Sequence, residues 1–343
     1  MTSRGGGMHD APPHMETELA APNRVSGSRR TLSGARPALY VSIVLGFVLA
    51  AYAYKLRTDG IFACHADGYA SDRYLAYCHA KGYGDYEHGA FWFGLEPSTR
   101  DAVSGAEVLF LGSSRMQIAL STAATNRWFS SDGVKYFLLG FGYNGNVLFE
   151  GDLVRKFGTH AKAYVISVDG FFIPHESQPV KAVLHDSSAR NHYEAKRLWQ
   201  LVHEDLCQGL PALCGKRYTI FRSRRTGAYQ LSGLGEFQGH PVSYDQSVDR
   251  AAAEREAAEG KAFLSELPVA SDCVILTAIP TGETGVGTAG AIAKTLGMPL
   301  VIPEVAGLQT FDGSHLDPES AERWSEAFLK AAGPQIRRCL GKD

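Results

Sequence analysis

The stretch Val108-Leu109-Phe110-Leu111-Gly112-Ser113-Ser114-Arg115 decides the fold. Four apolar residues run into a glycine, which is the pattern of a buried strand that ends in a tight turn. A helical pattern follows. A serine between a strand and a helix lies at the carboxyl edge of a parallel sheet, where open α/β sheets bind ligands. Ser114 therefore has a position that suits a nucleophile. An ordinary turn with a serine cap is the simpler alternative.

Strand and helix patterns alternate along the rest of the chain. This alternation predicts an α/β fold with a parallel sheet of about five strands and helices on both faces. A helix capped by Asp317 closes the series. The expected strands are 107–111, 134–139, 163–168, 273–279 and 299–302, and the expected helices are 115–127, 146–157, 249–267 and 288–296.

A second block near the end of the chain reads Phe311-Asp312-Gly313-Ser314-His315-Leu316-Asp317-Pro318. An aspartate and a histidine three residues apart can share one loop. The Asp312 carboxylate would then hold one ring nitrogen of His315, and the other nitrogen would accept the proton of a serine hydroxyl. The two blocks together predict a Ser-His-Asp triad of Ser114, His315 and Asp312.

These two blocks, and the strand–helix rhythm between them, resemble the SGNH (GDSL-like) hydrolase superfamily over residues 107–331. The resemblance implies a flavodoxin-like three-layer sandwich. It also implies that Ser114 is the nucleophile, His315 the general base and Asp312 the carboxylate that orients it. We expect no cofactor. We also expect no metal, because the histidine and cysteine spacings match no zinc pattern.

An acyl-transfer site also needs donors for the developing oxyanion. We expect one from the backbone N–H of Ser114 and a second from Gly145, in the glycine-rich loop 140–146. The family supplies an asparagine after its third strand, whereas this chain has Asp169 there. Asn144 is the candidate substitute. Arg115, Asp169 and Tyr143 are possible substrate-binding residues.

Departures of this kind resemble the membrane-anchored branch of the superfamily, which is similar to cell-envelope acyl-transfer proteins. The resemblance implies an exported serine esterase or O-acyltransferase that acts on acyl esters, acetyl esters first, of envelope or secreted carbohydrate. A membrane-bound O-acyltransferase is an implied partner. The alternatives are a general carboxylesterase or lipase, and a non-catalytic scaffold that binds glycan or a membrane acyltransferase.

The N-terminal region predicts export. Residues 1–37 have the composition of a disordered tail, and residues 38–54 form an uncharged run at the short end for a transmembrane helix. Five arginines precede this run, which favours a cytoplasmic N-terminus and an inner-membrane protein with one span and its body in the periplasm or outside the cell. A cleaved signal peptide and a buried core helix are the alternatives.

The rest of the chain divides into an irregular lead-in at 55–105 and a catalytic domain at 106–343, with an insertion at about 171–247 that is helical around 195–206. Six cysteines agree with an oxidising compartment. Neighbours in sequence favour two pairs and leave a third, and free buried thiols are the alternative. The pairs are Cys64–Cys78, Cys207–Cys214 and Cys273–Cys339.

A net charge of -2 argues against nucleic acid as a partner.

Overall fold

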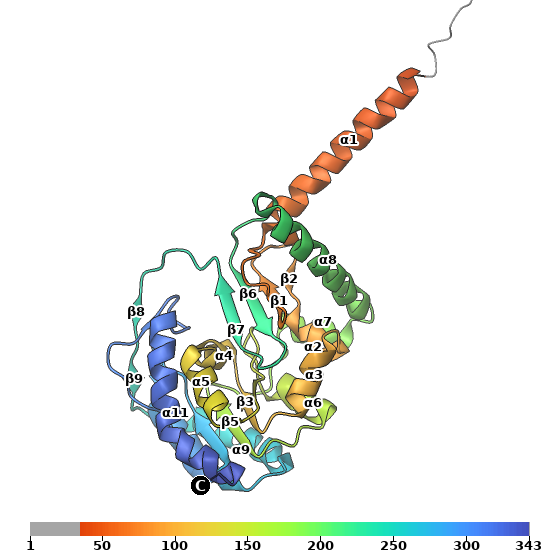
Figure 1. Ribbon diagram of the computed structural model, residues 1–343. Helices are drawn as coiled ribbons and strands as arrows, with labels where there is room; N and C mark the ends of the chain where they lie inside the picture. Colours follow the sequence, from red (N-terminus) through yellow and green to blue (C-terminus); the bar gives the residue numbers. More distant parts are fainter. Residues whose placement is uncertain (1–34, 343) are drawn as a thin grey trace, which may run out of the picture. The chain divides into compact units, whose positions relative to one another are not determined.

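The structure is a computed structural model that describes residues 35–342 (Figure 1). The chain divides into two units, residues 1–50 and 51–343, and the second unit is the body described below. The predicted tail at 1–37 lies outside the described residues except at its last three positions. Those three positions belong to helix α1 (Ala35–Thr58).

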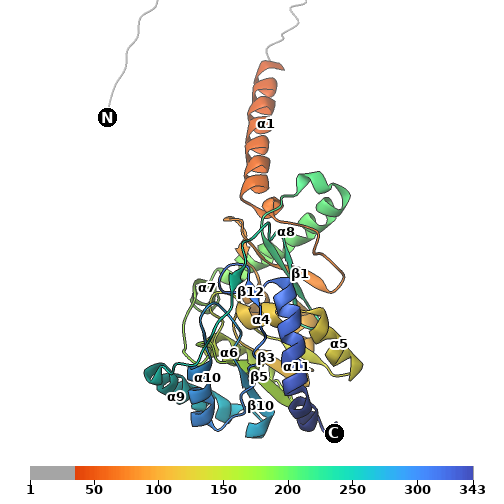
Figure 2. The same cartoon turned by 90° about the vertical axis from the view of Figure 1, so that its left-hand side faces the viewer.

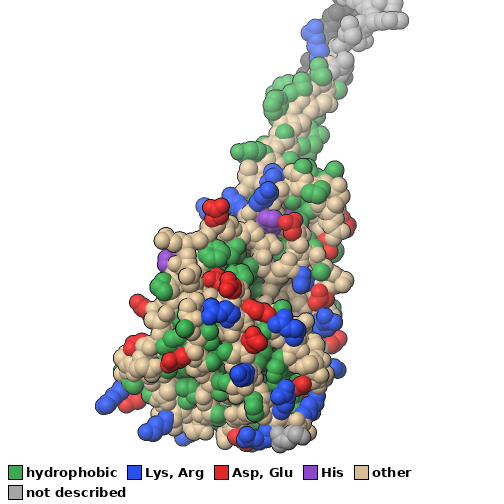
Figure 3. Space-filling model, turned by 60° about the vertical axis from the view of Figure 1, so that its left-hand side comes forward, with side chains coloured by type: hydrophobic (Ala, Val, Ile, Leu, Met, Phe, Trp, Pro, Cys, Tyr) green, Lys and Arg blue, Asp and Glu red, His purple; other side chains and the backbone are tan. Residues whose placement is uncertain are grey.

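Helix α1 is long and apolar enough to cross a membrane, by its length and composition, from Arg36 to Thr58. It extends beyond the predicted run of 38–54 at both ends. None of the residues in its most apolar window is buried, as a core helix would require, and Figure 3 shows hydrophobic side chains along it. Lys55 and Arg57 lie in its last turn.

The predicted α/β fold with a parallel sheet is confirmed. Strand β3 (Val108–Leu111) pairs on one side with β4 (Tyr136–Leu138) and on the other with β5 (Ala163–Ser167), which pairs with β10 (Val274–Thr277). All three pairings are parallel, so the order is β10-β5-β3-β4.

The sheet has four strands, and the fifth strand expected at 299–302 is wrong. The chain there makes a single parallel bridge, in which Leu276 N–H donates to Pro299 O and Val301 N–H donates to Leu276 O. Prolines at 299 and 303 bound this segment, and a proline has no N–H to donate to a ladder. The pairing therefore stops after one bridge.

Helices cover both faces of the sheet because the strand side chains alternate between them. Val108 and Phe110 pack in one cluster with residues of α4, α5 and α11, and Leu109 and Leu111 pack in another with residues of α6, α9 and α10. Figure 2 shows α10 and α11 on opposite sides of β3 and β5. The bounds are α4 (Ser114–Leu120), α5 (Ala123–Ser131), α6 (Val147–Phe157), α9 (Arg250–Glu266), α10 (Val286–Leu296) and α11 (Pro318–Leu340).

The helix expected at 115–127 is two helices. The chain breaks at Ser121 and Thr122, because Thr122 adopts an extended conformation and its Oγ1 accepts the N–H of Thr125 at 3.1 Å. A threonine that caps a new helix competes with continuation of the previous one.

A second sheet joins the lead-in to the insertion, so the prediction of an irregular lead-in is wrong. Four antiparallel strands run in the order β2-β1-β6-β7. A register shift between Leu75 and Tyr77 interrupts β1, which obscures the alternation that identifies a strand. The strands are β1 (Arg73–Cys78), β2 (Gly84–Asp85), β6 (Thr219–Ser223) and β7 (Tyr229–Ser232).

The other elements are short, apart from one helix of the insertion. Helix α8 (Ala189–Gly209) extends beyond the predicted range of 195–206 at both ends. The remaining elements are η1 (Ile61–Ala63), α2 (Glu87–Phe93), α3 (Pro97–Ser104), α7 (Gln178–His185), η2 (Pro211–Leu213), β8 (His240–Pro241), β9 (Tyr244–Asp245), η3 (Ser271–Cys273), β11 (Thr284–Gly285) and β12 (Gln309–Thr310).

All six cysteines form disulfides, and the predicted pairing is confirmed. One bridge joins the end of η1 to the last residue of β1, one closes the end of α8, and one joins η3 to α11. Their presence is compatible with a body that folds in an oxidising compartment. The pairs are Cys64–Cys78, Cys207–Cys214 and Cys273–Cys339.

Candidate active site

Ser114 is the first residue of α4, directly beyond the carboxyl end of β3. Helix α4 begins there because Ser113 caps it, with its Oγ accepting the N–H of Arg115 at 3.3 Å. The turn requires Gly112, which has φ +154°, since a Cβ there would come 2.9 Å from the Cβ of Ser167. The backbone N–H of Ser114 has no partner within the helix.

Asp312 and His315 lie on one loop between β12 and α11. One carboxylate oxygen of Asp312 accepts the backbone N–H groups of Ser314 at 2.9 Å and His315 at 2.8 Å. The other accepts from Nδ1 of the His315 ring at 2.8 Å. The Phe311 ring stacks on the His315 ring, with their centroids 5.6 Å apart. The aspartate therefore fixes both the loop and the ring.

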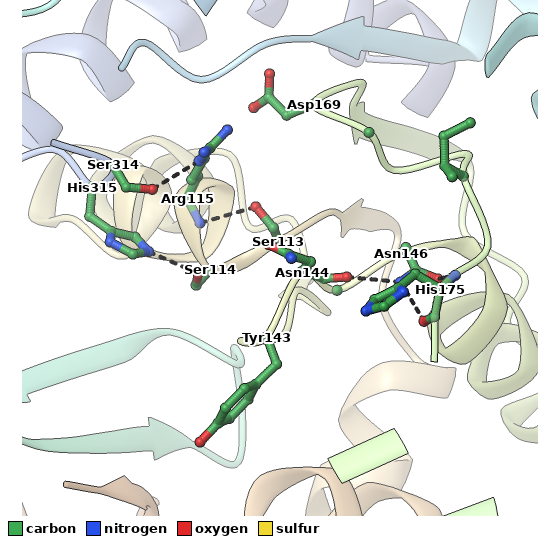
Figure 4. A pocket seen from close by; sticks show the side chains of 13 residues that line it. Ser113, Ser114, Arg115, Tyr143, Asn144, Asn146, Asp169, His175, Ser314 and His315 are labelled. Carbon is green, nitrogen blue, oxygen red and sulfur yellow. Dashed lines mark hydrogen bonds between the residues drawn. The ribbon is translucent and has the colours of Figure 1, made fainter. Parts of the chain in front are cut away.

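The fold brings Ser114, His315 and Asp312 together (Figure 4). Ser114 Oγ lies 2.8 Å from His315 Nε2, across 201 residues of sequence. Burial alone would raise the pKa of Asp312, but the bond from the His315 ring, the charge of that ring and the two backbone N–H groups outweigh it and lower the pKa to about 2. The carboxylate is therefore charged at neutral pH, and it holds the proton of the ring on Nδ1.

A polar cavity of about 540 Å³ opens beside the Ser114–His315 pair. Arg115 extends from α4 along its wall, held by a bond from Nε to Ser314 Oγ at 3.1 Å, and Figure 4 shows it pointing toward Asp169. All three predicted substrate-binding residues, Arg115, Asp169 and Tyr143, line this cavity.

Two hydrogen bonds fix the orientation of the Asp169 carboxylate. Its Oδ2 accepts from Ser167 Oγ at 3.0 Å and from the N–H of Ile279 at 3.2 Å. Burial raises the pKa of this carboxyl, and the positive charge of Arg115 partly offsets the increase. Its other oxygen remains available to a hydroxyl group in the cavity.

The loop 140–146 reaches the site because Phe141 extends the pairing of β4 with β3 as far as Ser113. Gly145 and Asn144, the predicted oxyanion residues, line the polar cavity together with Ser114. A Cβ at Gly145 would come 2.6 Å from Glu150 Oε1, so this position requires glycine. Neighbouring Tyr143 and Asn144 have φ of 55° and 60°. Such left-handed conformations cost about 1–3 kcal/mol each and cluster at functional sites.

A second cavity of about 220 Å³ also reaches Ser114 and His315. Its walls are largely aromatic, and most of them come from the second sheet and the segments beside it. Figure 4 shows the Tyr143 ring pointing away from Asp169. The same ring lies 6.2 Å from that of Tyr77, centroid to centroid. The aromatic side chains of this wall are Tyr77, Tyr143, Tyr218, Tyr229 and Phe311.

Two buried carboxyl groups beneath the site were missed by sequence reasoning. Glu150 on α6 is fully buried and accepts the N–H of Gly112 at 2.8 Å, directly behind Ser113. Burial raises the pKa of Glu150 well above its ordinary value. The Glu150 carboxyl therefore supports the turn that carries Ser114. The signal available was only a glutamate on the apolar side of a helix.

Glu87 forms the second group, with Arg222. Arg222 belongs to β6. Its guanidinium is fully buried, donates to Glu87 at 2.8 Å and lies 4.5 Å from the centroid of Phe91 and 4.6 Å from that of Phe141. Glu87 also accepts from Tyr229 at 2.7 Å and from the N–H of Gly142 at 3.4 Å. This network holds the loop 140–146 from below.

Two groups of described residues have the composition of a metal site. His203 lies beside Cys207 and Cys214, but those two cysteines form a disulfide. Asp85, Glu87 and His88 place ligand atoms within 4.8 Å of one another. Their oxygens and nitrogens are bonded instead within the protein, to Tyr193, Tyr229 and Arg222 and between Asp85 and His88. The second group is therefore a buried polar network.

No protein-family model, curated protein or solved structure matches this chain. The chemistry of the site therefore stands on its own geometry.

Proposed function

We propose that this chain is a serine O-acyltransferase or esterase of the SGNH type, with flavodoxin-like layering, that acts on acyl esters of carbohydrate. One observation carries the proposal. Ser114 Oγ, His315 Nε2, His315 Nδ1 and Asp312 Oδ2 form a line of two hydrogen bonds, each 2.8 Å long, at the carboxyl edge of a parallel sheet. That arrangement is the one by which a serine hydroxyl becomes a nucleophile.

The reaction proceeds through an ester on the serine. Ser114 Oγ attacks the acyl carbonyl carbon while its proton passes to His315 Nε2. The tetrahedral intermediate collapses, the alcohol of the donor leaves with that proton, and the acyl group stays on Ser114. A hydroxyl of the acceptor, or water, then attacks the same carbon with His315 as base. Ser114 recovers its proton when the acyl group departs.

The oxyanion forms next to the start of α4. In this proposal the backbone N–H of Ser114 donates to it, and the positive end of the helix favours its charge, although α4 is short. Gly145 and Asn144 supply the second donor from the loop 140–146, which Glu87 and Arg222 hold in place. The Asp169 carboxylate accepts hydrogen bonds from Ser167 and Ile279. In this proposal it therefore faces an acceptor hydroxyl rather than the oxyanion.

Two cavities at one nucleophile favour transfer over simple hydrolysis. The polar cavity, with Arg115 and Asp169, offers hydrogen-bond partners to sugar hydroxyls. The aromatic cavity offers rings on which the apolar face of a sugar or an acyl group can pack. A donor and an acceptor can thus reach Ser114 from different sides. As the resemblance to cell-envelope relatives implies, a membrane-bound O-acyltransferase is the proposed source of the acyl group.

The proposal places the body outside the cytoplasm, with α1 as a single anchor in the inner membrane. The apolar helix and the three disulfides are its support. The arginine-rich segment before α1 sets the direction of insertion by the positive-inside rule.

Labelling with a fluorophosphonate probe and turnover of a small acetyl ester test the proposal. Ser114→Ala should abolish both and leave thermal unfolding unchanged, since one hydroxyl is removed. Ser265→Ala is the matched control on an exposed turn of α9 and should label normally. If Ser114→Ala retains full function in cells, the chain is a non-catalytic scaffold instead. If an ordinary triglyceride is turned over faster than an acetylated sugar, it is a general lipase.

A further inference from the structure

Helix α8 has an apolar surface on the side away from the body. Tyr193, Gln200, His203 and Cys207 point inward and are buried. The opposite side exposes large hydrophobic groups, with Leu198 at 65% of its possible area, and the following turn continues the surface. We call this surface the α8 apolar face, which consists of Leu198, Trp199, Leu201, Val202, Leu206, Leu210 and Leu213.

This face is a local concentration rather than part of a general pattern. Among the described residues outside α1, exposed large hydrophobic side chains occur elsewhere only at Tyr143, Phe237 and Val248. Leu198, Val202 and Leu206 follow each other at intervals of four residues, so they form one stripe along the helix. A contiguous exposed stripe of this kind marks an interaction surface.

The face lies next to the end of α1. Arg217, just after η2, donates from Nη2 to the carbonyl of Thr58 at 3.0 Å. Phe62 in η1 packs on His203 of α8, with ring centroids 5.5 Å apart, and its carbonyl accepts the N–H of Gly215 at 2.7 Å. The C-terminal half of α8 therefore packs directly against the residues that follow α1.

The charges around this end of the body are mainly basic. Lys55, Arg57, Lys216 and Arg217 are exposed there, and all four belong to the last turn of α1 or the segment after η2. Three acidic residues lie in the same region: Asp205 on α8 is exposed, and Asp59 and Glu204 are partly exposed. Basic side chains beside leucine and tryptophan are typical of helices that lie at the headgroup level of a bilayer, and the three acidic groups limit the depth of insertion.

We propose that the α8 apolar face lies against the lipid surface of the membrane that α1 enters. A helix that leaves the bilayer at Thr58 puts every segment in contact with that point at the headgroup level. Trp199 would then lie among the headgroups, where tryptophan is favoured. The body would be held at two places, by α1 and by α8, with the Ser114 site in a fixed orientation to the membrane. This inference does not depend on the chemistry of that site.

Tryptophan quenching by brominated lipid tests the proposal on the full chain. The protein is reconstituted into vesicles of phosphatidylcholine and phosphatidylglycerol in equal amounts, with or without bromine on the acyl chains near the headgroups. Bromine quenches a tryptophan only on contact. We expect brominated lipid to lower the emission of the natural protein more than that of Trp199→Phe. The other three tryptophans are common to both proteins, so the difference reports Trp199 alone.

A double variant shows whether the stripe causes the contact. Leu198→Ser with Leu206→Ser should remove the Trp199-dependent quenching while α1 keeps the protein in the vesicles. Phe237→Ser, an exposed position away from α8, is the control and should quench normally. Equal emission of natural protein and Trp199→Phe on brominated lipid overturns the proposal, as does a chain that stays outside the vesicles. Shielding of Trp199 in native membranes without such quenching would assign the face to a protein partner, and would also overturn it.

Discussion

Replacing Asp312 with asparagine should separate the chemistry of the site from its architecture. One oxygen of Asp312 accepts two backbone N–H groups, at 2.9 and 2.8 Å, and an amide oxygen can do the same. The amide NH₂ group then takes the place of Oδ2, 2.8 Å from Nδ1 of His315. Two donors cannot face each other, so the ring proton moves to Nε2. His315 then has no lone pair to accept the proton of Ser114.

The expected loss follows from that change of tautomer. In serine triads with the ring held in the wrong tautomer, kcat falls by about 10⁴, and each factor of ten corresponds to about 1.4 kcal/mol in the barrier. Asp312 is 42% exposed, so water can replace part of the lost interaction. We therefore expect kcat to fall by about 10³ to 10⁴, and KM to change little because Asp312 acts through His315.

Initial rates with a chromogenic acetyl ester, and the rate of fluorophosphonate labelling, measure this loss. Asp317→Asn is the matched control, since it makes the same substitution two residues beyond His315. Asp317 caps α11, with Oδ1 accepting the N–H of Ser320 at 2.7 Å, and asparagine caps a helix equally well. Thermal unfolding should be the same for both variants. An Asp312→Asn protein within tenfold of the natural kcat, with a normal Asp317→Asn protein, would refute the tautomer argument.

The remaining predictions concern stability and topology. Serine at both positions of the Cys273–Cys339 pair should lower the free energy of unfolding by about 4 kcal/mol, and the same change at the Cys207–Cys214 pair should lower it by about 2 kcal/mol. The difference is expected because the sequence separations are 66 and 7. Equal losses in urea titrations would contradict this. Burial raises the pKa of Glu150 above its ordinary 4.5, so the stability it contributes is complete below that value and is lost as pH rises through the raised pKa. Glu150→Gln should make the melting temperature decline less with pH, and an unchanged slope would count against the raised pKa of Glu150. An alkaline phosphatase fused after the last residue should be active, whereas an inactive fusion beside an active cytoplasmic reporter would reverse the topology.

The parallel sheet was predictable because its signals are local. Val108–Leu111 are four buried apolar residues followed by a glycine, and the serine after it caps the next helix. The break at Thr122 was missed, because a threonine in a helical pattern is read as part of the helix until its side chain is seen to cap another. The expected fifth strand at 299–302 was wrong for a similar reason. An apolar run between two prolines resembles a strand, and only its pairing shows that it makes a single bridge.

The candidate site was predictable in its reactive groups but not in its support. Serine, aspartate and histidine carry recognisable chemistry, and Asp312 and His315 are three residues apart on one loop. Glu87 and Arg222 carry no such signal. They meet across 135 residues, and a charged residue in a sequence is expected on the surface unless its partner is known. The aromatic cavity was invisible because its walls come from a sheet that the sequence did not reveal.

The sequence by itself determined the four strands of the parallel sheet, the apolar run that becomes α1, the caps of α4 and α11, and the residues of the proposed triad. These features depend on propensities and side-chain bonds that act within a few residues. Only the tertiary structure decided that β1 pairs with β6, that Arg222 is buried against Glu87, and that α8 turns an apolar stripe outward. Each of these depends on which distant segments meet, and hydrophobic burial, which drives that choice, does not specify a partner in any short stretch of sequence.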